Sequence, residues 1–218
     1  MPAIGGVLVR VLVTGFEPFG GDTVNESWQA TTALATDWRA ARDGAELVVA
    51  PLPVTFSAGP AELLRLLGRH SPDVVVATGL AGGTEAVRLE RVAVNVADAR
   101  IPDNAGAQPV DEAVVGDGPA AYFSTLPLKA AWSAVRSDGV PATVSNTAGT
   151  YVCNATFYAL QHALAGRPAV RSGFVHVPRA AQLDVASSAR ALRAVVLTTA
   201  AAVRGELSEP RLAAGAEH

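Results

Sequence analysis

The chain has one cysteine, Cys153, and it lies where a turn-like segment leads into a helix-like pattern. Small and polar residues at 146–149 favour a tight turn, and apolar residues recur at spacings of three and four over 153–164. A helix N-terminus favours the reactive thiolate form of cysteine, because its N–H groups are unpaired and the helix dipole is positive there. Cys153 is therefore a candidate nucleophile, or a small buried hydrophobe, which is the commoner role of a free cysteine.

His176 lies near the end of a predicted strand over 172–177. A histidine at that position is either a hydrogen-bonded core residue or a base that faces the crevice beyond the carboxyl ends of the strands. The other histidines are less suggestive, because His70 and His162 fall late in predicted helices and His218 is the last residue. No pair of cysteine or histidine residues has the spacing of metal ligands, so the sequence predicts no metal site.

Glu90 lies in an apolar segment that predicts a strand over 87–97. On such a strand Glu90 shares a face with Val92 and Val94, where a carboxylate is costly to bury without a partner. The alternatives are a face open to water or an ion pair with a neighbouring arginine. A cysteine, a histidine and an acid are together the parts of an activated thiol, in which the base takes the thiol proton and the acid orients the base.

Residues 14–21 follow the first predicted strand, where a nucleotide-binding protein would place its phosphate loop. The segment lacks the G-x-G-x-x-G spacing and the Walker lysine, and two phenylalanines would obstruct the approach of phosphate to the backbone. Phe16 and Phe19 instead predict an apolar wall for a small uncharged group, or ordinary packing in the core.

Composition argues against several classes of function. Half of the 218 residues are hydrophobic and 17% are charged, which is typical of a folded domain. The net charge is −3 and the 17 Lys and Arg residues form no basic run, so we expect no nucleic-acid binding. We expect a cytoplasmic protein without membrane association, because there is a single cysteine, no leader-like start and no apolar segment of bilayer length.

Strand-like and helix-like patterns alternate along the chain. Strands are predicted over 7–14, 46–52, 73–78, 87–97, 140–145 and 172–177, and helices over 25–38, 60–70, 127–138, 153–164 and 184–203. The first of these helices starts at Asn25 or Ser27, and the last at Asp184 or Ser187. The alternation predicts one α/β domain over 1–218, a three-layer α/β/α sandwich with a largely parallel, mixed, twisted sheet. Residues 100–118 are expected to form a covering loop or a long connection, and residues 207–218 a flexible tail.

Five segments of the chain resemble those of pyroglutamyl peptidase I, also called pyrrolidone-carboxylate peptidase. They are 15–21 (GFEPFGG), 90–95 (ERVAVN), 98–104 (DARIPDN), 145–154 (SNTAGTYVCN) and 173–178 (GFVHVP), in this order over nearly the whole chain. The resemblance implies a cytoplasmic cysteine peptidase that removes N-terminal pyroglutamate (5-oxoproline) from small peptides. It also implies a phosphorylase/hydrolase-like α/β sandwich, a homotetramer, and no metal or organic cofactor.

Carried over motif by motif, the resemblance makes Cys153 the nucleophile, His176 the base and Glu90 the acid that orients the base. It also places Arg100 near the thiol. The residues that the resemblance implies around the pyrrolidone ring are Phe16, Phe19, Ile101, Tyr151 and Val152.

Three positions depart from the pattern of the resembled family. Leu80 stands where many members have glutamine, Arg88 where they have a small hydroxyl residue, and Arg179 where they often have an aromatic residue. These departures bear on substrate affinity and loop structure, since they leave the three catalytic residue types in place.

Two other functions are compatible with the residues. A nucleoside phosphorylase-like transferase would share the fold type and would need phosphate for turnover. A non-catalytic member of the family would keep the fold and bind peptide N-termini without cleaving them.

Overall fold

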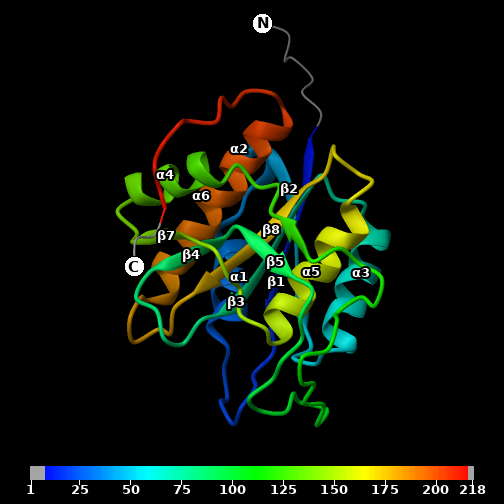
Figure 1. The fold of residues 1–218 in the computed structure, drawn as a ribbon. Helices are drawn as coiled ribbons and strands as arrows, with labels where there is room; N and C mark the ends of the chain where they lie inside the picture. The colour runs from blue at the N-terminus through cyan, green and yellow to red at the C-terminus, as the bar shows by residue number, and fades with distance from the viewer. Residues whose placement is uncertain (1–7, 216–218) are drawn as a thin grey trace, which may run out of the picture.

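A computed structural model describes residues 8–215 and shows a six-stranded sheet between two layers of helices (Figure 1). The strands of this sheet are β1 (Val9–Phe16), β2 (Ala45–Leu52), β3 (Val74–Leu80), β4 (Val87–Glu90), β7 (Ala142–Ser145) and β8 (Arg171–Val177). A separate two-stranded sheet consists of β5 (Val92–Val94) and β6 (Ala121–Phe123). The helices are α1 (Glu26–Asp37), α2 (Ala40–Asp43), α3 (Ala58–His70), α4 (Leu128–Ser137), α5 (Val152–Leu164) and α6 (Val185–Val203). The predictions for Val7, for His218 and for residues 216–218 of the tail lie outside the described residues.

The main sheet has the strand order β2-β1-β3-β8-β4-β7. Strands β2, β1, β3 and β8 run parallel, whereas β4 and β7 are parallel to one another and antiparallel to β8. The prediction of a largely parallel, mixed sheet is therefore confirmed. The reversal of β4 sets the start of β4 beside the end of β8.

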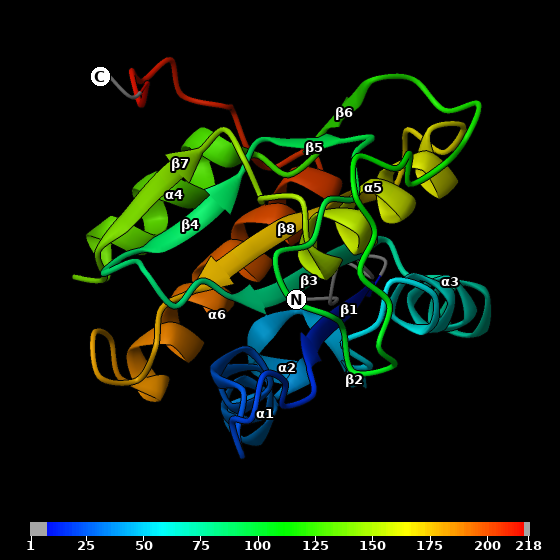
Figure 2. The ribbon, with the colours of Figure 1, turned by 60° about the horizontal axis from the view of Figure 1, so that its bottom comes forward.

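Helices cover both faces of the sheet, as strands with continuous apolar runs require. On one face, Val11 of β1 packs in a core cluster with residues of α1, α4 and α6. On the other face, Leu12 of the same strand packs in a second cluster with residues of α3 and α5. Figure 2 shows α1 and α6 on one side of the sheet and α3 and α5 on the other. The predicted three-layer arrangement follows from this alternation along the strands.

The single strand predicted over 87–97 is wrong, because the chain leaves the main sheet after Glu90. Arg91 donates its backbone N–H to Ser145 O, and the next residues pair as β5 with β6. The side-chain amide of Asn154 then takes the free edge of β5: it accepts from Val94 N at 3.0 Å and donates to Val94 O at 2.9 Å. Glu90 therefore shares no strand face with Val92 and Val94.

Helix starts follow local signals in the sequence. Asn25 caps α1 by accepting a hydrogen bond from Ser27 N at 3.0 Å, and Asp184 caps α6 by accepting one from Ser187 N at 2.7 Å. Of the alternatives Asn25 or Ser27 and Asp184 or Ser187, the structure selects the first of each pair as the cap. Strand β3 continues two residues past Thr78, its predicted end, because Gly79 and Leu80 pair with β8.

The prediction omitted the four-residue α2 and the three-residue β6. From Leu207 to Gly215 the chain has neither helix nor strand. This segment lies against the start of α4, where Lys129 N donates to Glu209 Oε1 at 2.8 Å.

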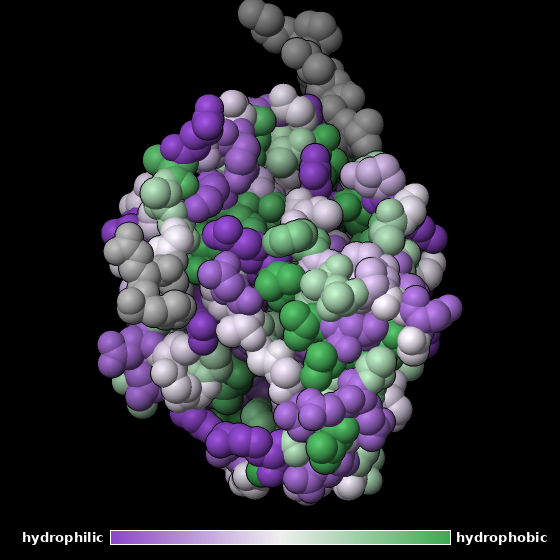
Figure 3. Space-filling view, in the orientation of Figure 1, coloured by the Kyte–Doolittle hydropathy of each residue, from purple (hydrophilic) through white to green (hydrophobic). Residues whose placement is uncertain are grey.

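The surface mixes hydrophobic and hydrophilic residues. Figure 3 shows hydrophobic residues grouped near the centre of one face, where Figure 1 places β5. Phe123 of β6 is 69% exposed, an unusual exposure for an aromatic residue on a strand. Within residues 8–215, no helix combines the length and the apolar character that crossing a membrane requires.

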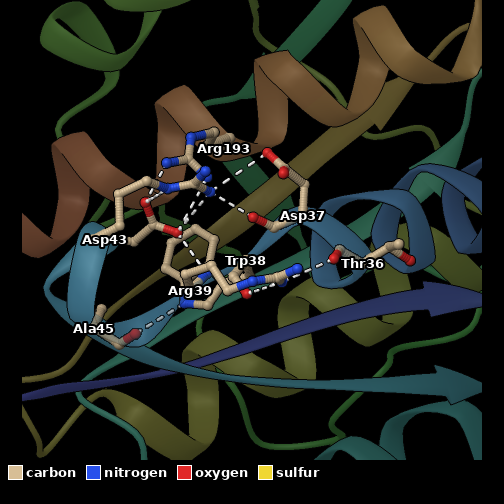
Figure 4. A network of polar contacts seen from close by, with 8 residues as sticks. Thr36, Asp37, Trp38, Arg39, Asp43, Ala45 and Arg193 are labelled. Atoms are coloured by element: carbon tan, nitrogen blue, oxygen red, sulfur yellow. Dashed lines mark hydrogen bonds and ion pairs between the residues drawn. The ribbon is translucent and has the colours of Figure 1, made fainter.

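A buried carboxylate, Asp43, joins α2 to α6 at the end of the sheet where β2 begins (Figure 4). Arg42 and Arg193 form ion pairs with Asp43, and Arg39 N donates to it at 2.9 Å. The Arg193 guanidinium also lies over the Trp38 ring, 5.4 Å from its centroid. Burial by itself raises the pKa of Asp43, but the hydrogen bonds from Arg42, Arg193 and Arg39 outweigh it and hold the pKa well below its usual range.

The substitution Asp43→Asn should lower the free energy of unfolding by about 2 kcal/mol at neutral pH, because it leaves Arg193 without its counter-charge. A carboxyl whose pKa is lowered by folding stabilises the native state at pH values above its unfolded pKa of about 3.9. This stabilisation is lost as the pH falls from about 3.9 toward the lower pKa of the folded state. Urea unfolding at several pH values should therefore show the two proteins converging below about pH 4.

The matched control is Asp37→Asn, which removes an exposed carboxylate paired with the same Arg42. It should change the free energy of unfolding by less than about 0.5 kcal/mol. Equal losses for Asp43→Asn and Asp37→Asn would show that burial of Asp43 is not what makes this network stabilising.

Candidate active site

Cys153 is the second residue of α5, directly after the turn predicted to precede it. Gly149 in this turn has φ 76°, a left-handed conformation that glycine adopts without a steric penalty. The N–H groups of the first helical turn have no preceding turn to bond to, and the helix dipole is positive there. This position favours negative charge on the sulfur and offers N–H donors to an anion beside it.

Glu90 and His176, 86 residues apart, meet because β4 lies antiparallel to β8. The register sets Glu90 opposite Phe174, two residues before His176 on the same strand, so both side chains project from one face. His176 Nδ1 lies 2.9 Å from Glu90 Oε1. A carboxylate only accepts hydrogen bonds, so this contact places a proton on Nδ1 and directs Nε2 away from Glu90.

Both members of this pair are shielded from water: Glu90 is fully buried and His176 is 6% exposed. Glu90 Oε2 has no hydrogen-bond partner among the residues described. An enclosed carboxylate is costly unless a cation or donor meets it. The open-to-water alternative for Glu90 is therefore excluded, and His176 is its hydrogen-bonded counterpart.

The Cys153 sulfur reaches His176 through a gap that Gly79 leaves in the sheet. Gly79 pairs with His176 in the register of β3 and β8. A Cβ atom on Gly79 would lie 2.7 Å from Cys153 Sγ and 2.9 Å from the Phe174 ring, both closer than packed atoms come. The sulfur occupies this space, beside the strand position that pairs with His176, and it is close enough to raise the pKa of His176. The structure thus brings together the three residues that the sequence singled out.

Three effects set the pKa of His176. Burial lowers it, whereas the hydrogen bonds and charges of Cys153 and Glu90 raise it, and the net result is a rise from 6.5 to about 9. His176 is therefore protonated at neutral pH, and an imidazolium beside the sulfur stabilises the thiolate.

A small apolar pocket adjoins the sulfur. Its lining consists of Phe16, Phe19, Asn25, Val54, Leu80, Tyr151, Val152 and Cys153. The free volume is only about 10 Å³, and the Tyr151 ring packs tilted against Phe19 and edge-on against Phe56 at ring separations of 6.2 and 5.3 Å. A ligand would have to displace one of these rings to enter.

Four of the six residues expected around the substrate line this pocket: Phe16, Phe19, Tyr151 and Val152. Arg100 and Ile101 do not line this pocket; both are exposed at the start of the turn-rich stretch 100–118. Sequence reasoning missed Val54, although it follows the carboxyl end of β2, where parallel strands gather ligands.

The turn-rich stretch 100–118 crosses near the pocket and is anchored by specific contacts. Tyr151 Oη donates to Pro102 O at 3.0 Å, and the Asn104 side chain donates to Pro18 O at 2.9 Å. Asp103 accepts from Phe56 N at 2.8 Å. Burial by itself raises the pKa of Asp103. The hydrogen bonds from backbone N–H groups outweigh this effect, so the pKa lies below its usual value. The covering-loop alternative for this stretch is the one that these contacts support.

Arg179 links two loops at the rim of the site. Its guanidinium lies 2.9 Å from Asp22 Oδ2, so the segment after His176 is tied to the segment after β1. The neighbouring Ala180 N donates to Glu26 Oε1 at 3.3 Å. Among residues 8–215, no group of three or more His, Cys, Asp or Glu side chains is placed to hold a metal ion.

Comparison with known proteins agrees with this geometry. A model of the pyroglutamyl peptidase family matches residues 9–205. The chain belongs to the pyroglutamyl peptidase family. The pyrrolidone-carboxylate peptidase of Clavibacter michiganensis subsp. michiganensis is 53% identical over 201 residues, which cover 91% of this chain and 92% of that protein.

Solved structures of the same family share the fold. Pyroglutamyl peptidase I of Bacillus amyloliquefaciens is 40% identical, with a TM-score of 0.83 over 88% of this chain and 97% of that chain. Pyrrolidone carboxyl peptidase of Thermococcus litoralis is 33% identical, with a TM-score of 0.86 over 94% of this chain and all of that chain. The resemblance found in the sequence is confirmed.

The gap at Gly79 provides a test of the site geometry. Gly79→Ala should lower the rate of alkylation of Cys153 by iodoacetamide by about 100-fold, because the new methyl group displaces the sulfur from His176. Overpacking against Phe174 should also cost about 1–3 kcal/mol of stability. Because Cys153 is the only cysteine, mass spectrometry reports its labelling directly.

Gly83→Ala is the matched control, since a Cβ at Gly83 meets no atom within 4 Å. It should leave both the alkylation rate and the stability unchanged. An unchanged alkylation rate in a folded Gly79→Ala protein would contradict the placement of the sulfur over Gly79.

Proposed function

We propose that this member of the pyroglutamyl peptidase family hydrolyses the amide bond between an N-terminal pyroglutamyl residue and the next residue of a peptide. The observation that carries the proposal is the meeting of Cys153, His176 and Glu90 beside an apolar pocket. In this proposal Cys153 is the nucleophile, His176 the acid and base, and Glu90 the residue that orients His176.

The reaction starts from the Cys153 thiolate and the His176 imidazolium. The thiolate attacks the pyroglutamyl carbonyl carbon, and N–H groups of the first turn of α5 stabilise the oxyanion by about 3 kcal/mol per donor. Collapse of the tetrahedral intermediate breaks the C–N bond as His176 gives its proton to the leaving amine. A thioester and a neutral imidazole remain.

Hydrolysis of the thioester reverses the role of His176. The neutral imidazole takes a proton from water as the water oxygen attacks the thioester carbonyl. The C–S bond then breaks, and pyroglutamate leaves. The thiolate and the imidazolium are restored, so the cycle consumes one water and needs no metal or organic cofactor.

The pocket gives this chemistry its substrate preference. Pyroglutamate is a lactam without an ammonium group, so a slot lined by Phe16, Phe19 and Val152 can receive it without burying a charge. An N-terminal glutamate or glutamine would bring an unpaired ammonium into the same slot. Binding displaces Phe19 or Tyr151, whose rings close the pocket.

We assign the remaining expectations on the strength of the family motifs. Arg100 and Ile101 contact the substrate from the covering loop, and residues 1–218 act as a single catalytic domain ending in a flexible tail. The protein works in the cytoplasm, where a lone cysteine stays reduced. It assembles as a homotetramer, to which the exposed Phe123 of β6 offers an apolar contact.

Cys153→Ala should lower kcat for a pyroglutamyl anilide by at least about 10⁴-fold while the protein still folds, because no other nucleophile is present at the site. Release of the aniline, followed by absorbance, measures this. Pretreatment of the unaltered protein with iodoacetamide should abolish turnover to the same extent.

The rival functions give other outcomes in the same assay. Turnover that needs inorganic phosphate and survives alkylation would favour a nucleoside phosphorylase-like transferase. Tight binding of pyroglutamyl peptides without any release of aniline would favour a non-catalytic binding protein.

The raised pKa of His176 sets the pH range of activity. Acylation needs the imidazolium, so kcat/KM should fall on the alkaline side with a midpoint near 9. Glu90→Gln should move this midpoint down by about one unit, because the carboxylate no longer stabilises the imidazolium. The pH dependence of kcat/KM for the two proteins measures the shift.

The same ionisation affects stability. A histidine whose pKa is raised by folding stabilises the native state fully below about pH 6.5, and this stabilisation is lost as pH rises through about 9.

If the alkaline midpoint of kcat/KM is unchanged in a folded Glu90→Gln protein, this would contradict the role of Glu90.

A further inference from the structure

Arg88 is placed beside the Glu90–His176 pair without belonging to it. In the register of β4 and β8, Arg88 lies directly opposite His176, and Glu90 follows two residues later on the same face of β4. Arg88 Nε is 4.0 Å from Glu90 Oε1, the oxygen that also meets His176. The Arg88 side chain is 33% exposed, so its guanidinium spans from the buried carboxylate to the solvent at the rim (Figure 2 shows β4 beside β8).

The charges around Glu90 are few. Within residues 8–215, its recorded ion pairs are with His176 and Arg88 alone, and its second oxygen has no hydrogen-bond partner. Around His176, α5 contributes one more titratable group, Cys153. The neighbours from β3 and β8 are Gly79 and Phe174, neither of which can carry a charge. Among residues 8–215, Arg88 is therefore the permanent cation that forms an ion pair with Glu90.

The proposed reaction leaves Glu90 without its first counter-charge. Once His176 has protonated the leaving amine, the imidazole is neutral and Glu90 remains an anion in an enclosed site. A neutral imidazole beside a buried carboxylate would tend to take its proton back, which favours the reverse of acylation. A cation that stays charged throughout the cycle removes this bias.

We propose that Arg88 is a positioning residue that balances the charge of Glu90 while His176 is neutral. The inference rests on the proposed function, and it deepens that function by assigning a role in proton transfer to a residue outside the cysteine, histidine and acid. Arg88 acts through Glu90 and touches no reacting atom.

The sign of the effect follows from the charges. The positive charge of Arg88 repels the positive charge of a protonated His176. Arg88 also partly neutralises Glu90, which stabilises that protonated form. Both effects lower the pKa of His176. Without Arg88, His176 should keep its proton to higher pH and give it up less readily to the leaving amine. Substrate binding should change little, because Arg88 is not among the residues that line the apolar pocket.

The experiment compares Arg88→Gln, Arg88→Lys and the unaltered protein in hydrolysis of a pyroglutamyl anilide over a range of pH. Arg88→Gln should lower kcat by about tenfold, change KM by less than about twofold and move the alkaline midpoint up by about half a pH unit. Arg88→Lys keeps the charge and should restore the midpoint and most of kcat.

Arg171→Gln is the matched control, because Arg171 is an exposed arginine at the opposite end of β8. It should leave kcat and the midpoint unchanged, and thermal unfolding should show that all variants are folded. A folded Arg88→Gln protein with an unchanged or lowered midpoint would overturn the role of Arg88. Absence of hydrolysis in the unaltered protein would instead refute the proposed function.

Discussion

The arrangement of the site depends on one enclosed charge. Glu90 is fully buried, and the closest group that offsets its charge is His176 Nδ1, 2.9 Å away. A carboxylate in such a place costs several kcal/mol when it has no counter-charge, so the imidazole is held in one orientation and retains its proton. That orientation directs the other ring nitrogen away from Glu90, and Cys153 is the second group that raises the pKa of His176. In the proposed reaction, the interaction that stabilises the buried carboxylate therefore also keeps the imidazole charged beside the thiol.

Features far apart in the sequence make this interaction possible. The reversal of β4 relative to β8 brings Glu90 and His176 to one face of the sheet. Gly79 leaves the space that the sulfur fills, and α5 carries Cys153 at its positive end. The next residue, Asn154, fixes this helix start to Val94 at the edge of β5 through two hydrogen bonds and to Val96 O just beyond it through a third. The pairing of β4 with β8, the space at Gly79 and the contacts of Asn154 thus position the three side chains of the site.

Local patterns in the sequence predicted what local physics controls. Continuous apolar runs indicated the buried strands, and the capping residues Asn25 and Asp184 indicated where helices begin. The end of β4 at Glu90 and the separate pairing of β5 were not predictable in this way. The edge of β5 is held by Asn154, which is remote in sequence. The importance of Gly79 also escaped, since an absent side chain matters only once its neighbours are known. Residue types alone left each candidate with a structural alternative, because they do not show which side chains the fold brings together.

His176 is held as an imidazolium between the Cys153 sulfur and a buried carboxylate. An NMR titration of isotope-labelled histidine, in the unaltered protein and in Cys153→Ala, measures this charge. His176 should titrate near pH 9 in the unaltered protein and at lower pH in the variant, because the sulfur no longer stabilises the imidazolium. Titration of His176 near pH 6.5 in both proteins would show that neither the sulfur nor Glu90 holds its proton.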